Sequence, residues 1–350
     1  MATTPACPSL SAVVLGLLVA GSAPLAGAEA VTVRPLDADS GVFGGIEVVR
    51  RYGIEGPSGL SGSLGWSLIA HRRTLARGEA AFTIKPGGAV DVSIPLQVPP
   101  VREGVVLEAE LTVSAFGGGV GGEAISHRRS LWIFPRDAFA GRTQWLEKLE
   151  VGLFDPRGET AAVFDAAGIP YRRVHRPQAI GAGSRLVVIG EGLAIEEHPG
   201  LAAAAFAAAE RGTPVLWLAP AAGHFALPGA GGTAAVLPGA LAFRDLGAIA
   251  EIDRRLDGEG GAGPDRAVAA MAVGSRHGEV VVEIAADAGG WPWFEVHYPP
   301  PGAGLIVCGL PLIARWEESP TPRFLLVRLF ERLTVPHADP APSAGASAER

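Results

Sequence analysis

Between residues 31 and 135, apolar and polar residues alternate in short segments that are separated by turns rich in glycine and proline. Alternation with a period of two places every second side chain on the same face, which predicts strands that are buried on one side. In one such segment Leu64, Trp66 and Leu68 would share an inward face. Short strands at this spacing are typical of an immunoglobulin-like β-sandwich. The predicted strands span residues 31–36, 46–52, 63–71, 80–84, 90–96, 105–116 and 125–134.

From about residue 150 the pattern changes to short, fully apolar runs that alternate with helical segments. Fully apolar strands are buried on both faces, as in a parallel sheet covered by helices. The apolar runs at 151–154, 186–190, 214–218 and 305–309, together with the more polar segment 171–175, are the predicted strands of this sheet. The predicted helices span residues 160–167, 200–211 and 246–256. The pattern therefore predicts an all-β domain followed by a three-layer α/β domain.

Two segments near the end of the chain have clear local patterns. Residues 279–285 and 293–298 both alternate, which predicts an antiparallel hairpin at one end of the sheet. Thr321 and Pro322 fit the first positions of a last helix. The apolar face of that helix would contain Leu325, Leu326, Leu329, Phe330 and Leu333.

The first 30 residues differ from the rest and predict a signal peptide. Residues 10–25 are apolar and small, without an acid or a base, and small-residue cleavage sites follow at Ala28 and Ala30. We therefore expect an exported protein, periplasmic or extracellular; a retained anchor and a disordered leader are the alternatives. Because Gly16, Gly21 and Pro24 interrupt the run, we expect no integral membrane span in the mature chain.

These patterns divide the chain into a signal peptide at residues 1–30, a sandwich at 31–135, a connecting helix and linker at 136–149, an α/β domain at 150–335 and a disordered tail at 336–350.

The net charge of -7 argues against a nucleic-acid partner, which would need a basic surface. Of the two cysteines, Cys7 lies in the leader and Cys308 in an apolar strand, so no internal disulfide is expected and Cys308 is predicted to be a buried, unreactive thiol. The eight histidines lack metal-ligand spacing, so neither a metal nor a cofactor is expected.

The segments Val49-Arg50-Arg51-Tyr52, Gly65-Trp66-Ser67 and Pro86-Gly87-Gly88 occur in that order in the first domain. In these segments the domain resembles the immunoglobulin-like accessory sandwich of family 2 glycoside hydrolases, the β-galactosidase group. Arg50 stands where that group has asparagine. The resemblance implies a module that flanks a catalytic barrel and does no chemistry itself. For Trp66 two interpretations remain open: a core side chain between the sheets, or a platform for stacking on a sugar.

The second domain contains the segments Leu153-Phe154-Asp155-Pro156, Val187-Val188-Ile189-Gly190-Glu191-Gly192 and Val307-Cys308-Gly309-Leu310. In these segments it resembles the class I glutamine-amidotransferase-like domains that are appended to some glycoside hydrolases. The resemblance implies a flavodoxin-like three-layer fold. Active amidotransferases carry a Gly-x-Cys-x-Gly elbow between a strand and a helix. The corresponding residues 217–224 contain neither Cys nor Ser, so we expect a relative without the nucleophile, and whether any enzymatic activity remains is open.

Ligands of open α/β sheets bind at the carboxyl ends of the strands. Five residues are expected at that edge and are our candidate ligand-binding residues: Asp155, Glu191, His224, Arg315 and Trp316. They could hold a polar small molecule, with the Trp316 indole stacked on it. Each also has an ordinary interpretation, since Asp155 could cap a helix, Glu191 line a loop and Arg315 pair with an acid.

The sequence favours an exported, non-catalytic binding or assembly module in carbohydrate handling, with a glycan or a glycoside hydrolase as its partner. The alternative is a hydrolase that acts on a glycan or an amide through Glu191 or His224 at the sheet edge. A third hypothesis is a scaffold that needs a partner chain. The oligomeric state does not follow from the sequence.

Overall fold

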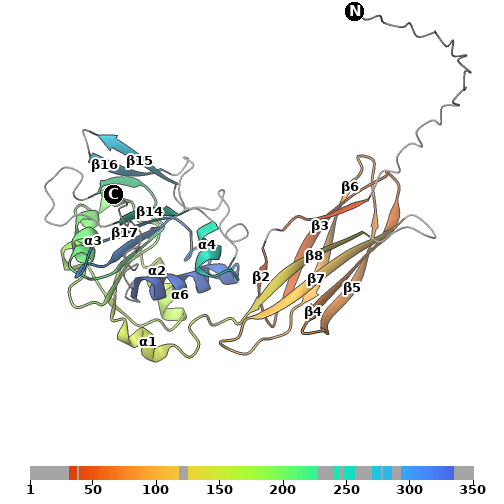
Figure 1. Ribbon diagram of the computed structural model, residues 1–350, viewed down its shortest axis with the longest axis horizontal. Coiled ribbons are helices and arrows are strands. Elements are labelled where there is room, and N and C mark those ends of the chain that lie inside the picture. Colours follow the sequence, from red (N-terminus) through yellow and green to blue (C-terminus); the bar gives the residue numbers. More distant parts are fainter. Residues whose placement is uncertain are drawn as a thin grey trace, which may run out of the picture.

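A computed structural model describes residues 31–37, 39–117, 125–227, 240–244, 247–256, 270–276, 279–285 and 293–334. The predicted leader and tail lie outside these residues. The chain is rich in β-structure and forms two lobes, a β-sandwich and an α/β lobe (Figure 1). Among the described helices, none combines the length and the apolar character needed to cross a bilayer.

The sandwich consists of a five-stranded sheet of order β2-β8-β7-β4-β5 and a three-stranded sheet of order β1-β3-β6. Alternation along each strand explains the core, because the inward residues Leu64, Leu68, Ile94 and Leu111 are fully buried between the sheets. The strands are β1 (Thr32–Pro35), β2 (Gly41–Phe43), β3 (Glu47–Glu55), β4 (Ser61–Ala70), β5 (Arg73–Thr83), β6 (Ala89–Gln97), β7 (Leu107–Gly117) and β8 (Ile125–Phe134).

Two features of the sandwich differ from the prediction. Strand β2 was not predicted; it is three residues long and pairs in parallel with β8. Strand β5 begins at Arg73, before the predicted residue 80. The reason is a two-residue turn in which His71 and Arg72 both have positive φ, so that Ala70 pairs directly with Arg73. Such a turn joins strands tightly although neither residue is glycine.

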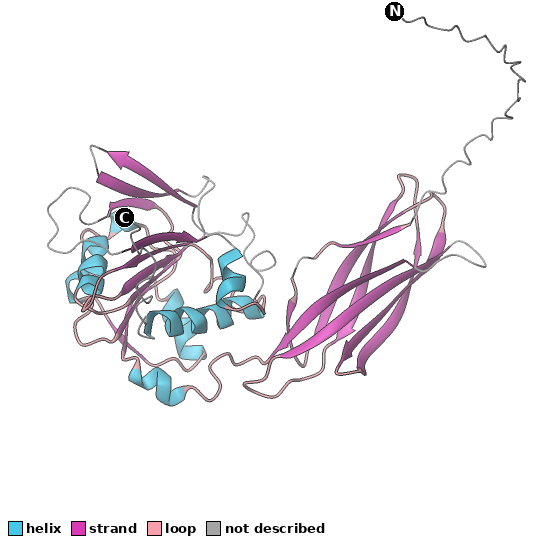
Figure 2. Ribbon diagram, in the orientation of Figure 1, coloured by secondary structure: helices cyan, strands magenta, loops and turns pink. Residues whose placement is uncertain are grey.

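The α/β lobe is built on a seven-stranded sheet of order β10-β9-β11-β12-β18-β17-β14. Figure 2 shows the strands and helices of this lobe in different colours. The first five strands are parallel, β17 is antiparallel to β18, and β14 is antiparallel to β17. Numbered by sequence, the parallel strands have the order 2-1-3-4-5, which is a common order of doubly wound sheets. The strands are β9 (Val151–Phe154), β10 (Tyr171–Arg173), β11 (Leu186–Ile189), β12 (Val215–Leu218), β14 (Ala240–Arg244), β17 (Trp293–His297) and β18 (Gly304–Cys308).

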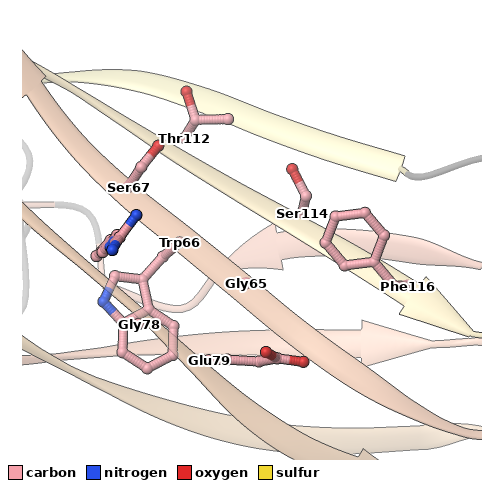
Figure 3. Close-up of a pocket in the computed structure, with 9 residues that line it drawn as sticks. Gly65, Trp66, Ser67, Gly78, Glu79, Thr112, Ser114 and Phe116 are labelled. Atoms are coloured by element: carbon pink, nitrogen blue, oxygen red, sulfur yellow. The ribbon is translucent and has the colours of Figure 1, made fainter. Parts of the chain in front are cut away.

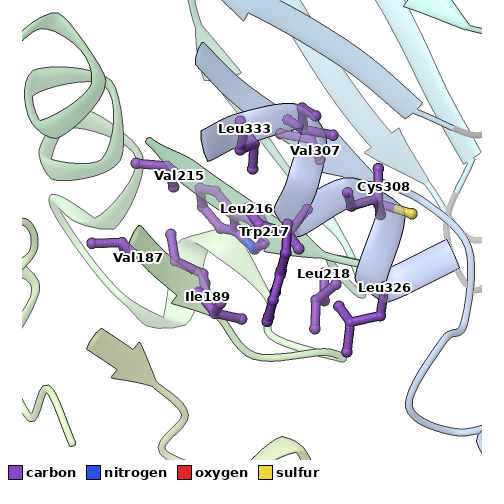
Figure 4. Packing of buried hydrophobic residues seen from close by; sticks show 14 of the residues in the cluster. Val187, Ile189, Val215, Leu216, Trp217, Leu218, Val307, Cys308, Leu326 and Leu333 are labelled. Atoms are coloured by element: carbon purple, nitrogen blue, oxygen red, sulfur yellow. The ribbon is translucent and has the colours of Figure 1, made fainter. Parts of the chain in front are cut away.

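The described helices follow the sequence pattern closely. They are α1 (Thr143–Lys148), α2 (Glu159–Ala166), α3 (Leu201–Glu210), α4 (Gly247–Ile252) and α6 (Pro320–Thr334), with 3₁₀ turns η1 (Pro177–Ala179) and η2 (Ile195–Glu197). The predicted apolar face of α6 is buried. The helix begins at Pro320, so Thr321 and Pro322 lie inside its first turn rather than at the predicted cap and first positions. Figure 4 shows part of this core, with Trp217 and Leu218 of β12, Cys308 of β18 and Leu326 of α6.

The predicted hairpin of residues 279–298 is wrong. Strand β16 (Glu279–Ala285) pairs with β13 (Gly223–Ala226) and β15 (Ala270–Arg276) in a separate three-stranded sheet. Strand β17 instead pairs with β14 and β18 in the main sheet. Alternation identifies a strand but not its partner, and both partners of β16 are strands that the sequence pattern did not reveal.

The two lobes are in direct contact. The rings of Phe134 in β8 and Phe324 in α6 lie with their centroids 4.7 Å apart, and the Arg323 guanidinium lies 4.7 Å above the ring of Phe43. Arg323 also donates to the carbonyl oxygen of Arg136 in the linker at 2.9 Å. Helix α6 therefore joins the sandwich to the sheet of the α/β lobe.

Candidate functional site

Asp155 stands at the end of β9, as predicted, and its carboxylate caps helix α2. One oxygen accepts the N–H of Gly158 at 3.1 Å and the other accepts the N–H of Ala161 at 2.8 Å. This arrangement satisfies backbone donors that a helix start leaves without partners. The capping interpretation of Asp155 is therefore confirmed. The next strand passes close by, since a Cβ at Gly190 would lie 2.8 Å from Oδ1 of Asp155.

Glu191 follows β11 and is buried, with 4% of its surface exposed. Its two carboxylate oxygens accept the N–H groups of Ile313 at 2.7 Å and Ala314 at 3.0 Å. Burial raises the pKa of Glu191, and the backbone hydrogen bonds from Ile313 and Ala314 oppose that rise. Glu191 thus fixes the loop after β18 to the end of β11. Both oxygens are used in doing so, which leaves the carboxylate poorly placed to act as a base.

Arg315 and Trp316 lie on the loop that Glu191 holds. Arg315 pairs with Glu318 at 3.0 Å, as its ordinary interpretation suggested. Trp316 is buried, and the Arg323 guanidinium lies 5.5 Å from the centre of its ring. The indole therefore packs at the contact between the lobes rather than standing open as a platform.

His224 lies apart from the other four candidate residues. It belongs to β13 in the separate three-stranded sheet, opposite Glu283 of β16. Its Nδ1 atom lies 3.0 Å from a carboxylate oxygen of Glu196, and about half of its side chain is exposed. The structure thus brings Asp155, Glu191, Arg315 and Trp316 into one connected region and leaves His224 at its border.

The residues that would form a nucleophile elbow do not form one. Strand β12 is followed by Ala219, Pro220 and two further alanines, and the chain then enters strand β13 rather than a helix. The exposed turn that activates such a nucleophile needs a strand followed directly by a helix. Cys308 is fully buried in β18, and burial raises the pKa of its thiol to about 12. The prediction of a buried core thiol is confirmed.

A small cavity of about 200 Å³ does lie at the carboxyl edge, beside Asp155. Its wall includes Pro156, and its polar rim is formed by Arg173 and His175 at the end of β10. Both rim side chains are exposed. A compact acidic or polar molecule would fit there. Sequence reasoning placed the edge correctly but did not single out these two rim residues.

A second, larger hollow lies on the outward face of the five-stranded sheet, and we call it the sheet groove (Figure 3). Its volume is about 550 Å³. Its lining comes from three adjacent strands, and most lining positions are small or carry a hydroxyl group. The residues are Gly65, Trp66, Ser67, Arg77, Gly78, Glu79, Thr112, Ser114 and Phe116.

Strand register explains why these residues meet. Gly65 of β4 is paired with Glu79 of β5 on one side and with Ser114 of β7 on the other. Ser67 is the centre of the next row, between Arg77 and Thr112. Since side chains alternate along a strand, both rows point outward, and the small central residues form the floor.

The wall of the sheet groove is aromatic. Phe116 of β7 is 50% exposed, and a Cβ at Gly65 would lie 3.3 Å from its ring. The ring therefore lies over the glycine floor with much of its surface open to solvent. Arg77 and Glu79 stand across the floor on β5. An open aromatic ring with hydroxyl groups and charged side chains around it can bind a ligand that has both apolar and polar faces.

Sequence reasoning missed the sheet groove. Trp66, which it did single out, is 8% exposed and belongs to the sandwich core, so its core interpretation is confirmed. The available signal was the outward set of β4, where glycine and serine take positions that usually carry larger polar side chains. Among the described residues there is no cluster of three or more His, Cys, Asp or Glu side chains that could hold a metal ion.

Comparison with protein families finds no match, and no curated protein matches the chain. Among solved structures, the chain is similar to the sporulation control protein Spo0M from Bacillus subtilis, with 16% identity and a TM-score of 0.21 over 34% of this chain and 55% of that one. The chain is also similar to a family 123 glycoside hydrolase from Clostridium perfringens, with 8% identity and a TM-score of 0.24 over 45% of this chain and 38% of that one. For a family 2 glycosyl hydrolase from Bacteroides cellulosilyticus DSM 14838, the identity is 14% and the TM-score 0.22, over 53% of this chain and 25% of that one. The chain thus spans about half or less of each of these structures, and TM-scores this low carry no argument about activity.

Proposed function

We propose that this protein is an exported, non-catalytic module that binds glycan in the sheet groove of its sandwich. The observation that carries the proposal is the half-exposed ring of Phe116 above the floor at Gly65. A sugar ring has an apolar face of C–H groups, which packs on an aromatic ring, and a rim of hydroxyl groups. Ser67, Thr112 and Ser114 line the same groove and can form hydrogen bonds with those hydroxyl groups.

The charged residues of the sheet groove fit the same ligand class. Arg77 carries only donors, and Glu79 carries only acceptors when it is ionised. Since they stand two residues apart on β5, they can bind neighbouring hydroxyl groups of one sugar. A purely apolar ligand would leave both without partners and would bind less well.

For the α/β lobe we propose an amidotransferase-like domain that lacks the nucleophile and serves as a scaffold for the sandwich. The 2-1-3-4-5 order of the parallel strands supports this assignment. So does the chain after β12, where Ala219 and Pro220 lead into a strand. Under this proposal the two lobes act as one accessory unit, with a glycan or a glycoside hydrolase as its partner.

The experiment that tests glycan binding is a screen of the purified chain against immobilised glycans, followed by titration of each glycan that binds. We expect Phe116→Ala to weaken binding by at least tenfold. Ser67→Arg, which fills the floor and leaves the aromatic ring in place, should abolish it. Val49→Ala is the matched control, because Val49 is an equally exposed apolar residue on the opposite sheet. A glycan that binds all four proteins equally would contradict the proposal.

The second candidate is a hydrolase, and the cavity beside Asp155 with its rim of Arg173 and His175 favours it. In that case the purified chain would turn over a glycan or an amide substrate. His175→Ala would reduce that turnover, because His175 stands on the rim of this cavity. The binding module instead predicts no turnover by any of these proteins, with glycan binding unaffected by His175→Ala.

A further inference from the structure

Four polar side chains lie between the two sheets of the sandwich, where the other inward positions are apolar. Arg50 and Tyr52 come from β3, and His127 and Arg129 come from β8. Arg50 is 6% exposed and Tyr52 is 1% exposed. We call these four residues the inter-sheet cluster. It lies outside the sheet groove, which is on the outward face of β4, β5 and β7.

The segment that crosses from β1 to β2 covers the inter-sheet cluster. Arg129 donates to the carbonyl oxygen of Asp37 at 2.7 Å and to that of Asp39 at 2.8 Å. Arg50 donates to the carbonyl oxygen of Gly41 at 3.4 Å. The ends of both guanidinium groups thus bind this crossing segment, which explains part of their burial.

Other polar atoms of the same residues remain without a partner. The buried atoms Nε of Arg50, Nε of Arg129, the hydroxyl of Tyr52 and Nδ1 of His127 have no hydrogen-bond partner among the residues that the structure describes. Buried polar groups are nearly always paired, because an unpaired one has lost its hydrogen bonds to water without replacing them. Four such atoms on facing strands offer hydrogen bonds to a group that is not part of the chain.

The charges of the inter-sheet cluster indicate the kind of occupant. Burial lowers the pKa of Arg50, and the neighbouring Arg129 lowers it further, while Asp39 and Asp37 oppose the shift. The Asp37 carboxylate accepts the N–H of Arg51 at 2.6 Å and pairs with its guanidinium at 3.3 Å. The rings of Tyr52 and His127 meet edge to face with centroids 6.0 Å apart. The interior therefore combines the buried guanidinium of Arg50 and the part-buried guanidinium of Arg129 with a hydroxyl that can turn toward a shared ligand.

We propose that the inter-sheet cluster binds a small inorganic anion of halide size. The Nε–H groups of Arg50 and Arg129 can only donate, and the Tyr52 hydroxyl can donate as a third. An anion accepts from all three at once, whereas a water molecule accepts from two and then needs acceptors for its own hydrogens. The anion also offsets the two guanidinium charges, which otherwise repel each other in the interior.

The test is thermal unfolding of the purified chain in sodium chloride, sodium bromide and sodium gluconate at equal ionic strength. A ligand that binds only the folded state raises the unfolding temperature with its concentration until the site is full. We expect the two halides to raise it in this saturable way and gluconate not to. Tyr52→Phe removes one donor at nearly constant shape and should weaken the halide effect severalfold; Arg50→Gln should abolish it. Arg51→Gln and Arg128→Gln are matched controls, because these neighbours point out of the same strands.

Crystals grown in sodium bromide give a second readout that does not depend on stability. We expect an anomalous peak within hydrogen-bond distance of Arg50 Nε and the Tyr52 hydroxyl. Water alone at that position would overturn the proposal. A halide effect of the same size in Tyr52→Phe and Arg50→Gln would overturn it as well, since the halide would then act elsewhere.

Discussion

The indole of Trp66 lies against the Cα of Gly78 in the neighbouring strand, so closely that a Cβ at position 78 would be 2.2 Å from Cζ2 of the ring. The two residues are directly paired across β4 and β5. The large ring is accommodated only because its partner has no side chain. This contact helps to hold the Trp66 ring in the core of the sandwich.

The first prediction concerns this pair. Gly78→Ala should destabilise the protein by about 1–3 kcal/mol, since the added methyl group must displace a ring that is packed between the sheets. The measurement is urea unfolding of the single variants and of the pair. In a Trp66→Leu background the same change should cost clearly less, because the ring is gone. Gly65→Ala is the control, because only the exposed Phe116 ring lies near it. Equal costs at positions 65 and 78 would show that the contact does not matter.

The second prediction concerns Asp253 after helix α4. Burial raises the pKa of Asp253. The hydrogen bonds and charge of Arg255 and the hydrogen bond from Arg328 of α6 lower it by more, so that the pKa falls from 3.8 to about 2. A depressed pKa stabilises the fold above about pH 4, and that contribution is lost as the pH falls toward 2. Asp253→Asn should therefore cost about 2 kcal/mol at pH 7, and the difference from the natural protein should shrink between pH 4 and pH 2.

Urea unfolding at several pH values checks this prediction. Glu318→Gln is the control, because it breaks the pair that the half-exposed Glu318 makes with Arg315 and should change stability by less than about 0.5 kcal/mol. A cost for Asp253→Asn that is independent of pH would mean that the charge of Asp253 is not what ties α4 to α6.

The third prediction concerns Arg323, which joins the lobes. Its guanidinium donates to the carbonyl oxygens of Trp316 and Arg136 and stacks on Phe43. Arg323→Ala should loosen the contact between the lobes, because all of these interactions end together. We expect a larger radius of gyration in small-angle scattering and faster protease cleavage between residues 136 and 142. Arg185→Ala, which removes an exposed pair with Glu150, should change neither. An unchanged scattering curve for Arg323→Ala would contradict this role.

The fourth prediction concerns the Cys308 thiol. Since burial raises its pKa to about 12, it should not react with a thiol reagent at pH 8 while the protein is folded. In a Cys7→Ser variant, which leaves Cys308 as the single thiol, labelling should proceed at the rate of unfolding. Stoichiometric labelling within seconds under native conditions would show that β18 opens locally.

Sequence patterns located most strands because burial on one or both faces produces a readable period. The bounds of β8 and β9 coincide with the prediction, since a clear alternation and a fully apolar run mark them. Strands β2 and β13 were missed because they are short, and β14 and β15 were assigned to no element. Partner choice failed for β16, because pairing depends on the whole fold rather than on one segment.

For the candidate site too, local features could be predicted from the sequence and contacts between distant segments could not. The rule for α/β sheets correctly placed Asp155 and Glu191 at the ends of their strands, but it did not reveal that backbone N–H groups already occupy both carboxylates. The sheet groove depends on register between β4, β5 and β7, which no local pattern contains. Its one prominent residue in the sequence, Trp66, faces the other side of the sheet.

The most direct test of the glycan-binding proposal is a titration of the best-binding glycan against the natural protein, Phe116→Ala and His175→Ala, with the dissociation constant as the readout. The proposal predicts that Phe116→Ala raises the dissociation constant at least tenfold and that His175→Ala leaves it unchanged. An unchanged constant for Phe116→Ala, together with a loss for His175→Ala, would contradict it and move the binding site to the edge of the α/β sheet.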